Sequence, residues 1–212
     1  MVKVKICGIT NTEDALWAAS LGADYIGLNF YKNSLRNISV ENARNIVEKL
    51  PHFVLPVGVF VDEDENKIQK VAKKTNIRII QLHGNETPEK CRRIKEVLSL
   101  PIIKAFKVKD ESIIETIRDY LQDIDYILLD THVEGMEGGT GEVFNWDIAV
   151  KVSKEYCNKP LFLAGGITPE NVTSAIEKVL PYGIDVASGV ERSPRRKDYD
   201  KMRSLILSAK GL

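Results

Sequence analysis

The chain has 212 residues, and its 30 lysines and arginines balance 30 aspartates and glutamates, so the formal net charge is zero. Because no basic arm or acidic tail appears, we expect neither nucleic acid nor an anionic membrane to be a main partner. No apolar run approaches the roughly 18 residues of a membrane span, and three cysteines without a CxxC pair argue against a disulfide framework or a zinc cluster. The N-terminal MVKVKICG lacks the apolar region of a signal peptide, so we expect a cytoplasmic protein.

Short runs rich in β-branched and aromatic residues alternate along the chain with segments whose apolar residues recur at helical spacing. The strand candidates cover residues 2–7, 24–30, 53–61, 77–83, 101–108, 126–131, 160–166 and 184–189. The i, i+3, i+4, i+7 spacing of a helix begins at Ala43, at Val172 and at Met202. The pattern therefore predicts alternating strands and helices from one end of the chain to the other.

Three segments carry signals for the start of a helix. Thr87-Pro88-Glu89 and Thr168-Pro169-Glu170 each offer an N-cap, a proline in the first turn and an acidic residue after it. Thr10 and Glu13 have the spacing of a capping box, and Gly22 is placed to end the helix that would begin there.

Eight units of a strand followed by a helix predict a parallel (β/α)8 barrel, the TIM barrel, although this fold typically has about 250 residues. An open doubly wound sheet has the same local pattern, but no Gly-x-Gly-x-x-Gly follows the first strand. Because no Pro- or Ser-rich linker divides the chain, we expect a single domain over residues 1–212. The C-terminal ends of the strands are then where chemistry should gather.

Cys7 stands at the end of the first strand. Alternation places Lys3, Lys5 and Cys7 on one face and the apolar residues between them on the other, so Cys7 should look into the barrel. A free cysteine is usually a small buried hydrophobe, but nearby positive charge can turn it into a base or nucleophile. We therefore regard Cys7 as a candidate catalytic residue, and we expect Cys91 and Cys157 to be inert.

Asp130 ends the apolar strand YILLDT. Aspartate is disfavoured in strands and costly to bury without a partner, so it either orders the following loop or serves as a general acid or base opposite Cys7. Residues 132–145 after it are long and rich in glycine, which is typical of a lid or a binding loop.

Two glycine-containing sites stand at the ends of the last two strand candidates. Gly165 and Gly166 end the seventh candidate, and Ser188 and Gly189 end the eighth. Loops at these positions of a barrel often bind phosphate through backbone N–H groups. Tight turns would explain one such site, but two together favour a small phosphorylated molecule as the ligand.

Arg36, just after the second strand, is a surface residue or a bidentate partner for a carboxylate. His83 ends the fourth strand, where it could be a base or a hydrogen-bonded structural residue. His52 and His132 stand elsewhere in the sequence, so no metal triad is visible. Lys104 in the fifth strand could be the Schiff-base lysine of an aldolase, but we expect it to fill the polar layer inside the barrel.

The whole chain resembles the phosphoribosylanthranilate isomerase family. The matching segments are VKICGIT, GADYIGLNFYKNSLRNIS, VGVFV, IIQLHGNE, LLDTHVEGMEGGTGEVFNW, LAGGITPENV and DVASGVE. The combination of VKICGIT with GGTG-x-x-F-x-W is highly specific. The resemblance implies a cofactor-free Amadori rearrangement of N-(5-phosphoribosyl)anthranilate to 1-(2-carboxyphenylamino)-1-deoxyribulose 5-phosphate in tryptophan biosynthesis.

The resemblance also implies roles for single residues. Asp130 would be the general acid that opens the ribose ring, and Cys7, as a thiolate, would be the general base that removes the C2 proton. Arg36 would hold the anthranilate carboxylate. The phosphate would be held by Gly166, Ser188 and Gly189. Members of the family occur as monomers and homodimers, and either state is open for this chain.

Three positions depart from the family pattern. Asn145 stands where aspartate is frequent, Ala187 where serine is common, and Arg195 where glycine often stands. These departures bear on substrate affinity more than on the type of reaction. The alternatives are another phosphate-sugar barrel, such as an indole-glycerol-phosphate synthase or the histidine-pathway isomerase, and a non-catalytic phosphate-binding barrel. An indole-glycerol-phosphate synthase should rely on a catalytic lysine, and the histidine-pathway isomerase should have an aspartate where Cys7 stands.

Overall fold

The structure is a computed structural model that describes residues 1–130 and 146–211. Its elements in chain order are β1 (Lys3–Ile6), α1 (Thr12–Ser20), β2 (Tyr25–Asn29), α2 (Val40–Val47), β3 (Leu55–Phe60), α3 (Glu65–Thr75), β4 (Ile79–Leu82), α4 (Pro88–Leu98), β5 (Ile102–Lys107), α5 (Ile113–Arg118), β6 (Tyr126–Asp130), α6 (Trp146–Glu155), β7 (Leu161–Leu163), α7 (Val172–Val179), β8 (Gly183–Val186), the short 3-10 helix η1 (Ser188–Val190), β9 (Glu191–Ser193), β10 (Arg196–Lys197) and α8 (Tyr199–Lys210). Within the described residues, no helix is long and apolar enough to cross a membrane.

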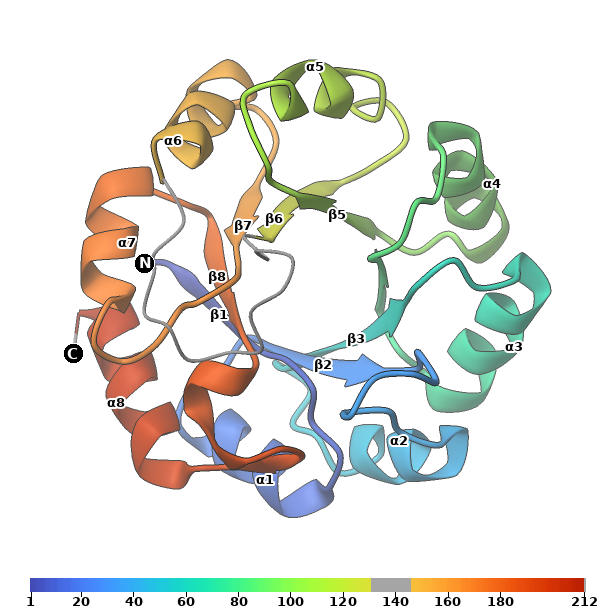
Figure 1. The fold of residues 1–212 in the computed structure, drawn as a ribbon. Coiled ribbons are helices and arrows are strands. Elements are labelled where there is room, and N and C mark those ends of the chain that lie inside the picture. The colour runs from blue at the N-terminus through green and yellow to red at the C-terminus, as the bar shows by residue number, and fades with distance from the viewer. Residues whose placement is uncertain (131–145, 212) are drawn as a thin grey trace.

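Strands β1 to β8 form a closed parallel barrel, and the helices surround it (Figure 1). Closure is visible in β1, where Lys5 pairs with Tyr25 of β2 on one side and with Asp185 of β8 on the other. An open doubly wound sheet has two edges, so this ring confirms the (β/α)8 barrel and excludes the open sheet. The single domain over residues 1–212 stays a prediction.

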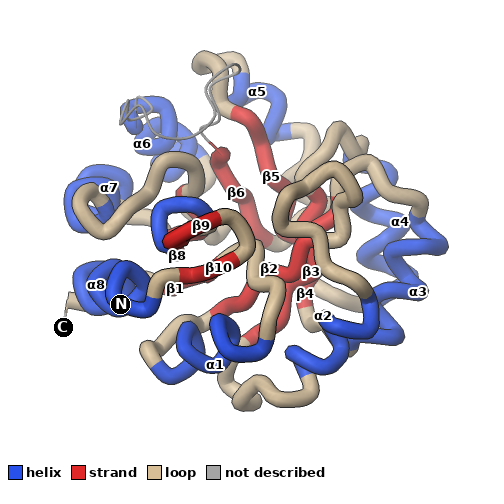
Figure 2. Tube along the Cα trace, turned by 60° about the horizontal axis from the view of Figure 1, so that its bottom comes forward, coloured by secondary structure: helices blue, strands red, loops and turns tan. Residues whose placement is uncertain are grey.

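An antiparallel hairpin of β9 and β10 lies between β8 and α8 (Figure 2). It reaches the loops that follow β1 and β2, because the Thr10 hydroxyl donates to the carbonyl of Arg195 and the Arg195 guanidinium donates to the carbonyl of Leu35. The last segment of the chain therefore contacts the loops that leave its first two strands.

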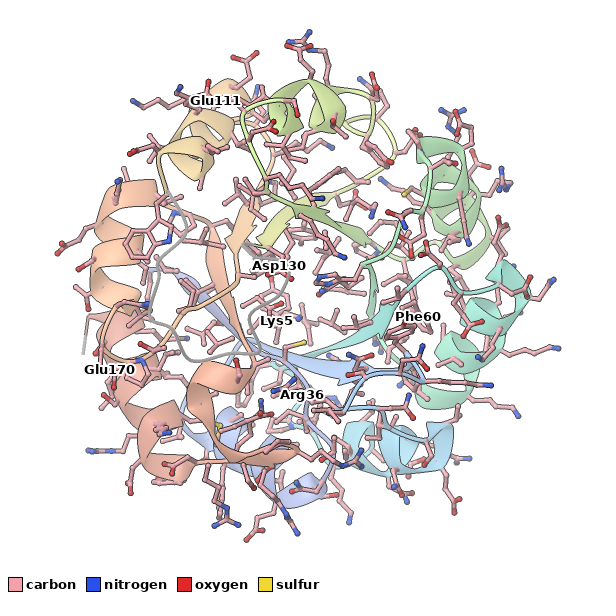
Figure 3. The ribbon with its side chains drawn as sticks, viewed as in Figure 1. Lys5, Arg36, Phe60, Glu111, Asp130 and Glu170 are labelled. Carbon is pink, nitrogen blue, oxygen red and sulfur yellow. The ribbon has the colours of Figure 1, made fainter. Side chains whose placement is uncertain are left out.

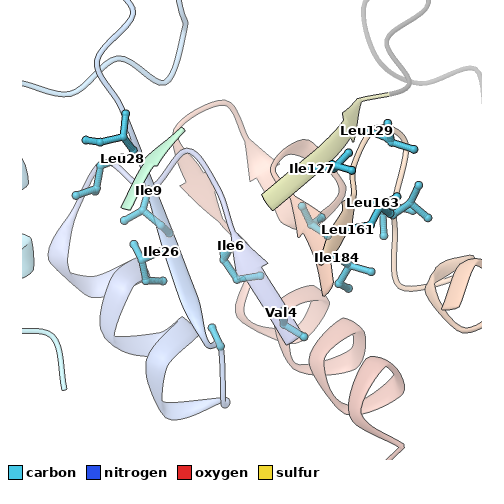
Figure 4. Close-up of a cluster of buried hydrophobic side chains, with 14 of the residues drawn as sticks. Val4, Ile6, Ile9, Ile26, Leu28, Ile127, Leu129, Leu161, Leu163 and Ile184 are labelled. Atoms are coloured by element: carbon cyan, nitrogen blue, oxygen red, sulfur yellow. The ribbon is translucent and has the colours of Figure 1, made fainter. Parts of the chain in front are cut away.

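Strand alternation sorts the side chains of β1 as the sequence predicts. Lys5 is fully buried and lies near the middle of the ring of strands (Figure 3). Val4 and Ile6 pack instead in the large apolar cluster between strands and helices (Figure 4). Burial of apolar area in that outer cluster is the main force that holds the helices on the barrel.

A second apolar cluster fills the inside of the barrel. At its centre, Tyr25 and Phe162 contact edge to face, with ring centroids 5.3 Å apart, and the hydroxyls of Tyr25 and Tyr182 are 3.0 Å apart. Tyr25 begins β2 and Tyr182 precedes β8, so this cluster closes the N-terminal end of the barrel. The opposite end, where the strands finish, is left for polar groups.

Helix starts follow the sequence signals only in part. Thr87 caps α4 as predicted, and Gly22, with φ +99°, follows the C-cap of α1. The capping box from Thr10 is wrong, because the side chain of Asn11 accepts from the N–H of Asp14 and caps α1 one residue later.

The predicted cap at Thr168 is also wrong. Helix α7 begins at Val172 with Asn171 at its N-cap, and a turn over residues 168–171 precedes it. In that turn the Asn171 side-chain oxygen accepts from the N–H of Thr168, and the Thr168 carbonyl accepts from the N–H of Val172. The Thr-Pro-Glu signal therefore begins a turn that leads into the helix.

Candidate active site

The predicted site residues share one end of the barrel, where its parallel strands finish. They are Cys7 after β1, Arg36 between β2 and α2, His83 after β4, Asp130 at the end of β6, Gly165 and Gly166 after β7, and Ser188 and Gly189 in η1 after β8. Figure 3 shows Arg36 and Asp130 near the middle of the ring of elements. The sequence analysis therefore identified residues from the whole length of the chain that lie at the same end of the barrel, its mouth.

Cys7 extends the pairing of β1 with β8, since its N–H donates to the carbonyl of Val186 at 2.8 Å. The thiol is half-buried beside Gly27 of β2. A Cβ at Gly27 would stand 2.6 Å from Cys7 Sγ and 3.1 Å from Lys5 Nζ, so the missing side chain makes room for both groups. The thiol therefore lies close to the ammonium of a buried lysine.

Lys5 forms an ion pair with Asp185, with 2.8 Å between Nζ and Oδ2 and side chains that are 0% and 7% exposed. Burial opposes the charged form of the lysine, but Asp185 and Cys7 together outweigh it and raise the pKa of Lys5. Asp185 Oδ1 is buried and has no hydrogen-bond partner among the described residues. Both the pair and this oxygen were missed by the sequence reasoning.

Burial raises the pKa of the Cys7 thiol, although the Lys5 ammonium opposes this effect. The site therefore favours the thiol at neutral pH, whereas the resemblance implied a thiolate. The positive charge of Lys5 is present beside the thiol, but the cost of burying the thiolate is larger than the benefit of that charge.

Asp130 is hydrogen-bonded to His83, with 3.0 Å between Oδ2 and Nε2. His83 Nδ1 lies 3.0 Å from Nε2 of Gln81. With the NH2 group of the Gln81 amide donating to Nδ1, Nε2 is the ring nitrogen that donates to the Asp130 carboxyl group. Of the two roles that the sequence left open for His83, the geometry favours the hydrogen-bonded partner.

Arg36 is gripped by Glu191, with 2.8 Å from Nε to Oε1 and 2.6 Å from Nη2 to Oε2. Lys197 donates to the same carboxylate at 3.1 Å and to the carbonyl of Ala187 at 2.7 Å. Burial favours protonation of Glu191, but Arg36 and Lys197 hold the pKa of its carboxyl below the ordinary value. The stem of Arg36 lies over Gly8, where φ is +73° and a Cβ would stand 2.3 Å from Arg36 Cδ.

The loops after β7 and β8 touch each other. Gly165 and Gly166 have φ of +78° and +64°, a conformation that suits glycine and ends β7 earlier than the sequence predicted. A Cβ at Gly189 would stand 2.0 Å from the carbonyl oxygen of Ile167, so only glycine allows this approach. The two predicted phosphate loops therefore form one continuous backbone surface.

The departures from the family pattern also have positions in the structure. The Ala187 carbonyl accepts the bond from Lys197, and Arg195 adopts φ +72°, a value that explains why glycine often stands there. Asn145 and the predicted lid 132–145 lie outside the described residues. Within residues 1–130 and 146–211, no group of three or more His, Cys, Asp or Glu could hold a metal ion.

A family model described as N-(5'phosphoribosyl)anthranilate (PRA) isomerase matches residues 4–208. The N-(5'-phosphoribosyl)anthranilate isomerase of Geotalea uraniireducens (strain Rf4) is 47% identical over 212 residues, which cover 100% of both chains. The crystal structure of phosphoribosyl anthranilate isomerase from Thermotoga maritima is 46% identical and has a TM-score of 0.93, with 100% of both chains covered. The crystal structure of a phosphoribosyl anthranilate isomerase in complex with reduced 1-(o-carboxyphenylamino)-1-deoxyribulose 5-phosphate is 44% identical, with a TM-score of 0.89 and 100% of both chains covered. With its closed barrel and this likeness along its whole length, the chain belongs to the N-(5'-phosphoribosyl)anthranilate isomerase family.

Proposed function

We propose that this isomerase of tryptophan biosynthesis uses Asp130 as general acid and Cys7 as general base to convert N-(5-phosphoribosyl)anthranilate to 1-(2-carboxyphenylamino)-1-deoxyribulose 5-phosphate. The observation that carries this proposal is the placement of the thiol and the carboxyl at the ends of β1 and β6, in the same mouth as Arg36. A base and an acid on separate strands can act on two different atoms of one substrate.

The rearrangement needs one proton delivered and one removed. Asp130 protonates the ring oxygen of the ribose, which breaks the C1–O bond and leaves a Schiff base between C1 and the anthranilate nitrogen. Cys7 then removes the proton from C2, and the electron pair moves toward the nitrogen to form an enolamine. Tautomerisation of the enolamine gives the C2 ketone. In this scheme His83 orients the Asp130 carboxyl through its bond to Oδ2.

Cys7 has to lose its proton before it can act as the base. Since burial disfavours the thiolate, its formation depends on positive charge close to Sγ. Lys5 supplies that charge, and its ion pair with Asp185 keeps the ammonium in place. The same buried pair thus holds the first strand to the last. Its lysine assists the general base, whereas the negative charge of Asp185 opposes the thiolate.

The two ends of the substrate have matching groups at the mouth. Arg36 would hold the anthranilate carboxylate, as guanidinium groups do in bidentate pairs. The backbone around Gly165, Gly166, Ser188 and Gly189 would hold the phosphate, for which close approach to N–H groups is needed. A cytoplasmic location, and a monomeric or homodimeric state, stay predictions.

A fluorescence time course with phosphoribosylanthranilate generated in situ tests the proposal. The intact chain should consume the fluorescent substrate, and Cys7→Ala and Asp130→Asn should each slow turnover by about 10²- to 10⁴-fold, the usual contribution of one acid or base. Cys157→Ala, which removes an exposed thiol, is the matched control and should leave turnover unchanged. Full turnover without Cys7 would remove it as the base.

A non-catalytic phosphate-binding barrel remains a distinct outcome of the same assay. It would bind the substrate without consuming it, and the Cys7 and Asp130 variants would have no activity to lose. No turnover by the intact chain would support that alternative. The other phosphate-sugar barrels are disfavoured, because the family match covers residues 4–208.

A further inference from the structure

We propose that Glu191 is a positioning residue for substrate recognition, which holds the Arg36 guanidinium ready for the carboxylate of the substrate. This inference rests on the proposed function, in which Arg36 binds that carboxylate. Glu191 begins β9 in the hairpin after the last barrel strand, 155 positions from Arg36 in the sequence. Its role is to act through Arg36.

The first argument is the geometry of the guanidinium. Glu191 occupies Nε and one hydrogen of Nη2 in a side-on bidentate pair. Nη1, by contrast, has no hydrogen bond to any of the described residues, and a guanidinium has five N–H groups in one plane. Glu191 therefore fixes that plane and leaves the other edge of the fork for a second carboxylate.

The second argument is charge. Arg36 and Glu191 alone would form a neutral pair with little attraction for an anion. Lys197 donates to the same carboxylate, and its side chain is 1% exposed against 5% for Glu191. Burial lowers the pKa of Lys197, and the Glu191 carboxylate opposes that effect. With Lys197 protonated, the three groups together have a net charge of +1, so Glu191 can position Arg36 while the cluster still attracts an anionic ligand.

The third argument is the link to the phosphate loop. Lys197 Nζ also donates to the carbonyl of Ala187, the residue immediately before Ser188 and Gly189. One buried lysine thus ties Glu191 to the loop proposed for phosphate. Through Lys197 and Glu191, this connection links the position of Arg36 to that of the loop.

Arg36 has more contacts that fix its position than a typical surface ion pair has. Its stem occupies the space left open by Gly8, and Arg195 donates to the carbonyls of Leu35 and Asn37 on either side of it. The backbone, the stem and the head group of Arg36 are therefore each held by a different partner. Such anchoring limits the rotamer freedom that a flexible arginine would lose on binding.

The test is the affinity for the reduced product analogue 1-(o-carboxyphenylamino)-1-deoxyribulose 5-phosphate, measured by calorimetry, compared with the same compound without its carboxyl group. Glu191→Gln should weaken binding of the first compound at least about tenfold, because a charge-assisted bidentate pair is lost. Binding of the compound without the carboxyl should change by less than about twofold, since Arg36 has no carboxylate to grip there.

Asp123→Asn is the matched control. Asp123 is also a buried carboxylate that receives a bidentate arginine, with 2.8 and 3.1 Å to Arg92, but the pair lies between α4 and the start of β6. This variant should change neither affinity. If Glu191→Gln does not fold, Glu191→Asp is the second variant, since its side chain is one methylene shorter and keeps the carboxylate. It should show the same selective loss of affinity for the compound with the carboxyl group, but a smaller one.

Equal weakening of both compounds by the Glu191 variants would overturn the proposal, because it would indicate general damage to the site. Unchanged affinity for both would overturn it as well. Failure of the proposed function is a separate result, since it appears as an intact chain that leaves phosphoribosylanthranilate unconsumed, whereas binding of the reduced analogue requires no turnover.

Discussion

Replacement of Lys5 by methionine removes one partner of the buried ion pair while keeping a side chain of similar shape. The pair is nearly solvent-free, and Asp185 Oδ1 already lacks a hydrogen-bond partner among the described residues. Breaking such a pair leaves an uncompensated buried charge and costs about 3–5 kcal/mol. For a chain of this length, each kcal/mol lowers Tm by about 2–4 °C, so the expected decrease in Tm is roughly 6–20 °C.

Urea unfolding followed by circular dichroism would give the free energy of unfolding of the intact chain and of Lys5→Met. The double variant Lys5→Met/Asp185→Asn should recover at least about half of the loss, because the unpaired charge is then gone. A single-variant loss below about 1 kcal/mol, the usual value of an exposed pair, would refute the reasoning. So would a double variant that is no more stable than Lys5→Met.

Two further outcomes follow from the residues next to this pair. Because burial raises the pKa of Cys7, the rate at which iodoacetamide labels it should still rise about tenfold per pH unit between about pH 7 and pH 9. Mass spectrometry measures this rate, and a rate that levels off below about pH 8 would contradict the prediction. Gly8→Ala should destabilise the chain by about 1–2 kcal/mol, because φ at this position is +73°. It should also weaken substrate binding, because the added methyl group displaces Arg36. A normal KM and a normal free energy of unfolding would show that the loop adapts to the methyl group.

The barrel could be predicted because its strands obey a simple local rule. In β1, polar and apolar side chains alternate, so the sequence alone places Lys5 inside and Val4 outside, and burial agrees. Helix starts are harder to predict, since Thr168 and Asn171 are both of residue types that favour the N-cap position. Asn171 takes the N-cap position of α7, and the sequence contains no local feature that decides between the two.

The sequence predicted the candidate-site residues at the strand ends, but it did not predict the residues that contact them from elsewhere in the chain. Cys7 and Arg36 follow strands and Asp130 ends one, so the rule that barrel chemistry gathers at the C-terminal ends of strands finds all three. Asp185 and Glu191 were missed, because they act on Lys5 and Arg36 from 180 and 155 positions away. A single sequence shows which residues carry charge, but it does not show which distant charges will meet. For Glu191, its position at the end of the family segment DVASGVE was the available signal.

The pairing of Lys5 with Asp185 has a consequence for how the protein is made. During synthesis the first strand leaves the ribosome long before β8 exists, so a nascent chain has a lysine in β1 whose counter-charge is still 180 residues away. Until that partner arrives, placing Lys5 in an apolar interior is costly, and early closure of a smaller, wrong barrel is penalised. The ion pair therefore favours completion of the barrel only when the last strand is available.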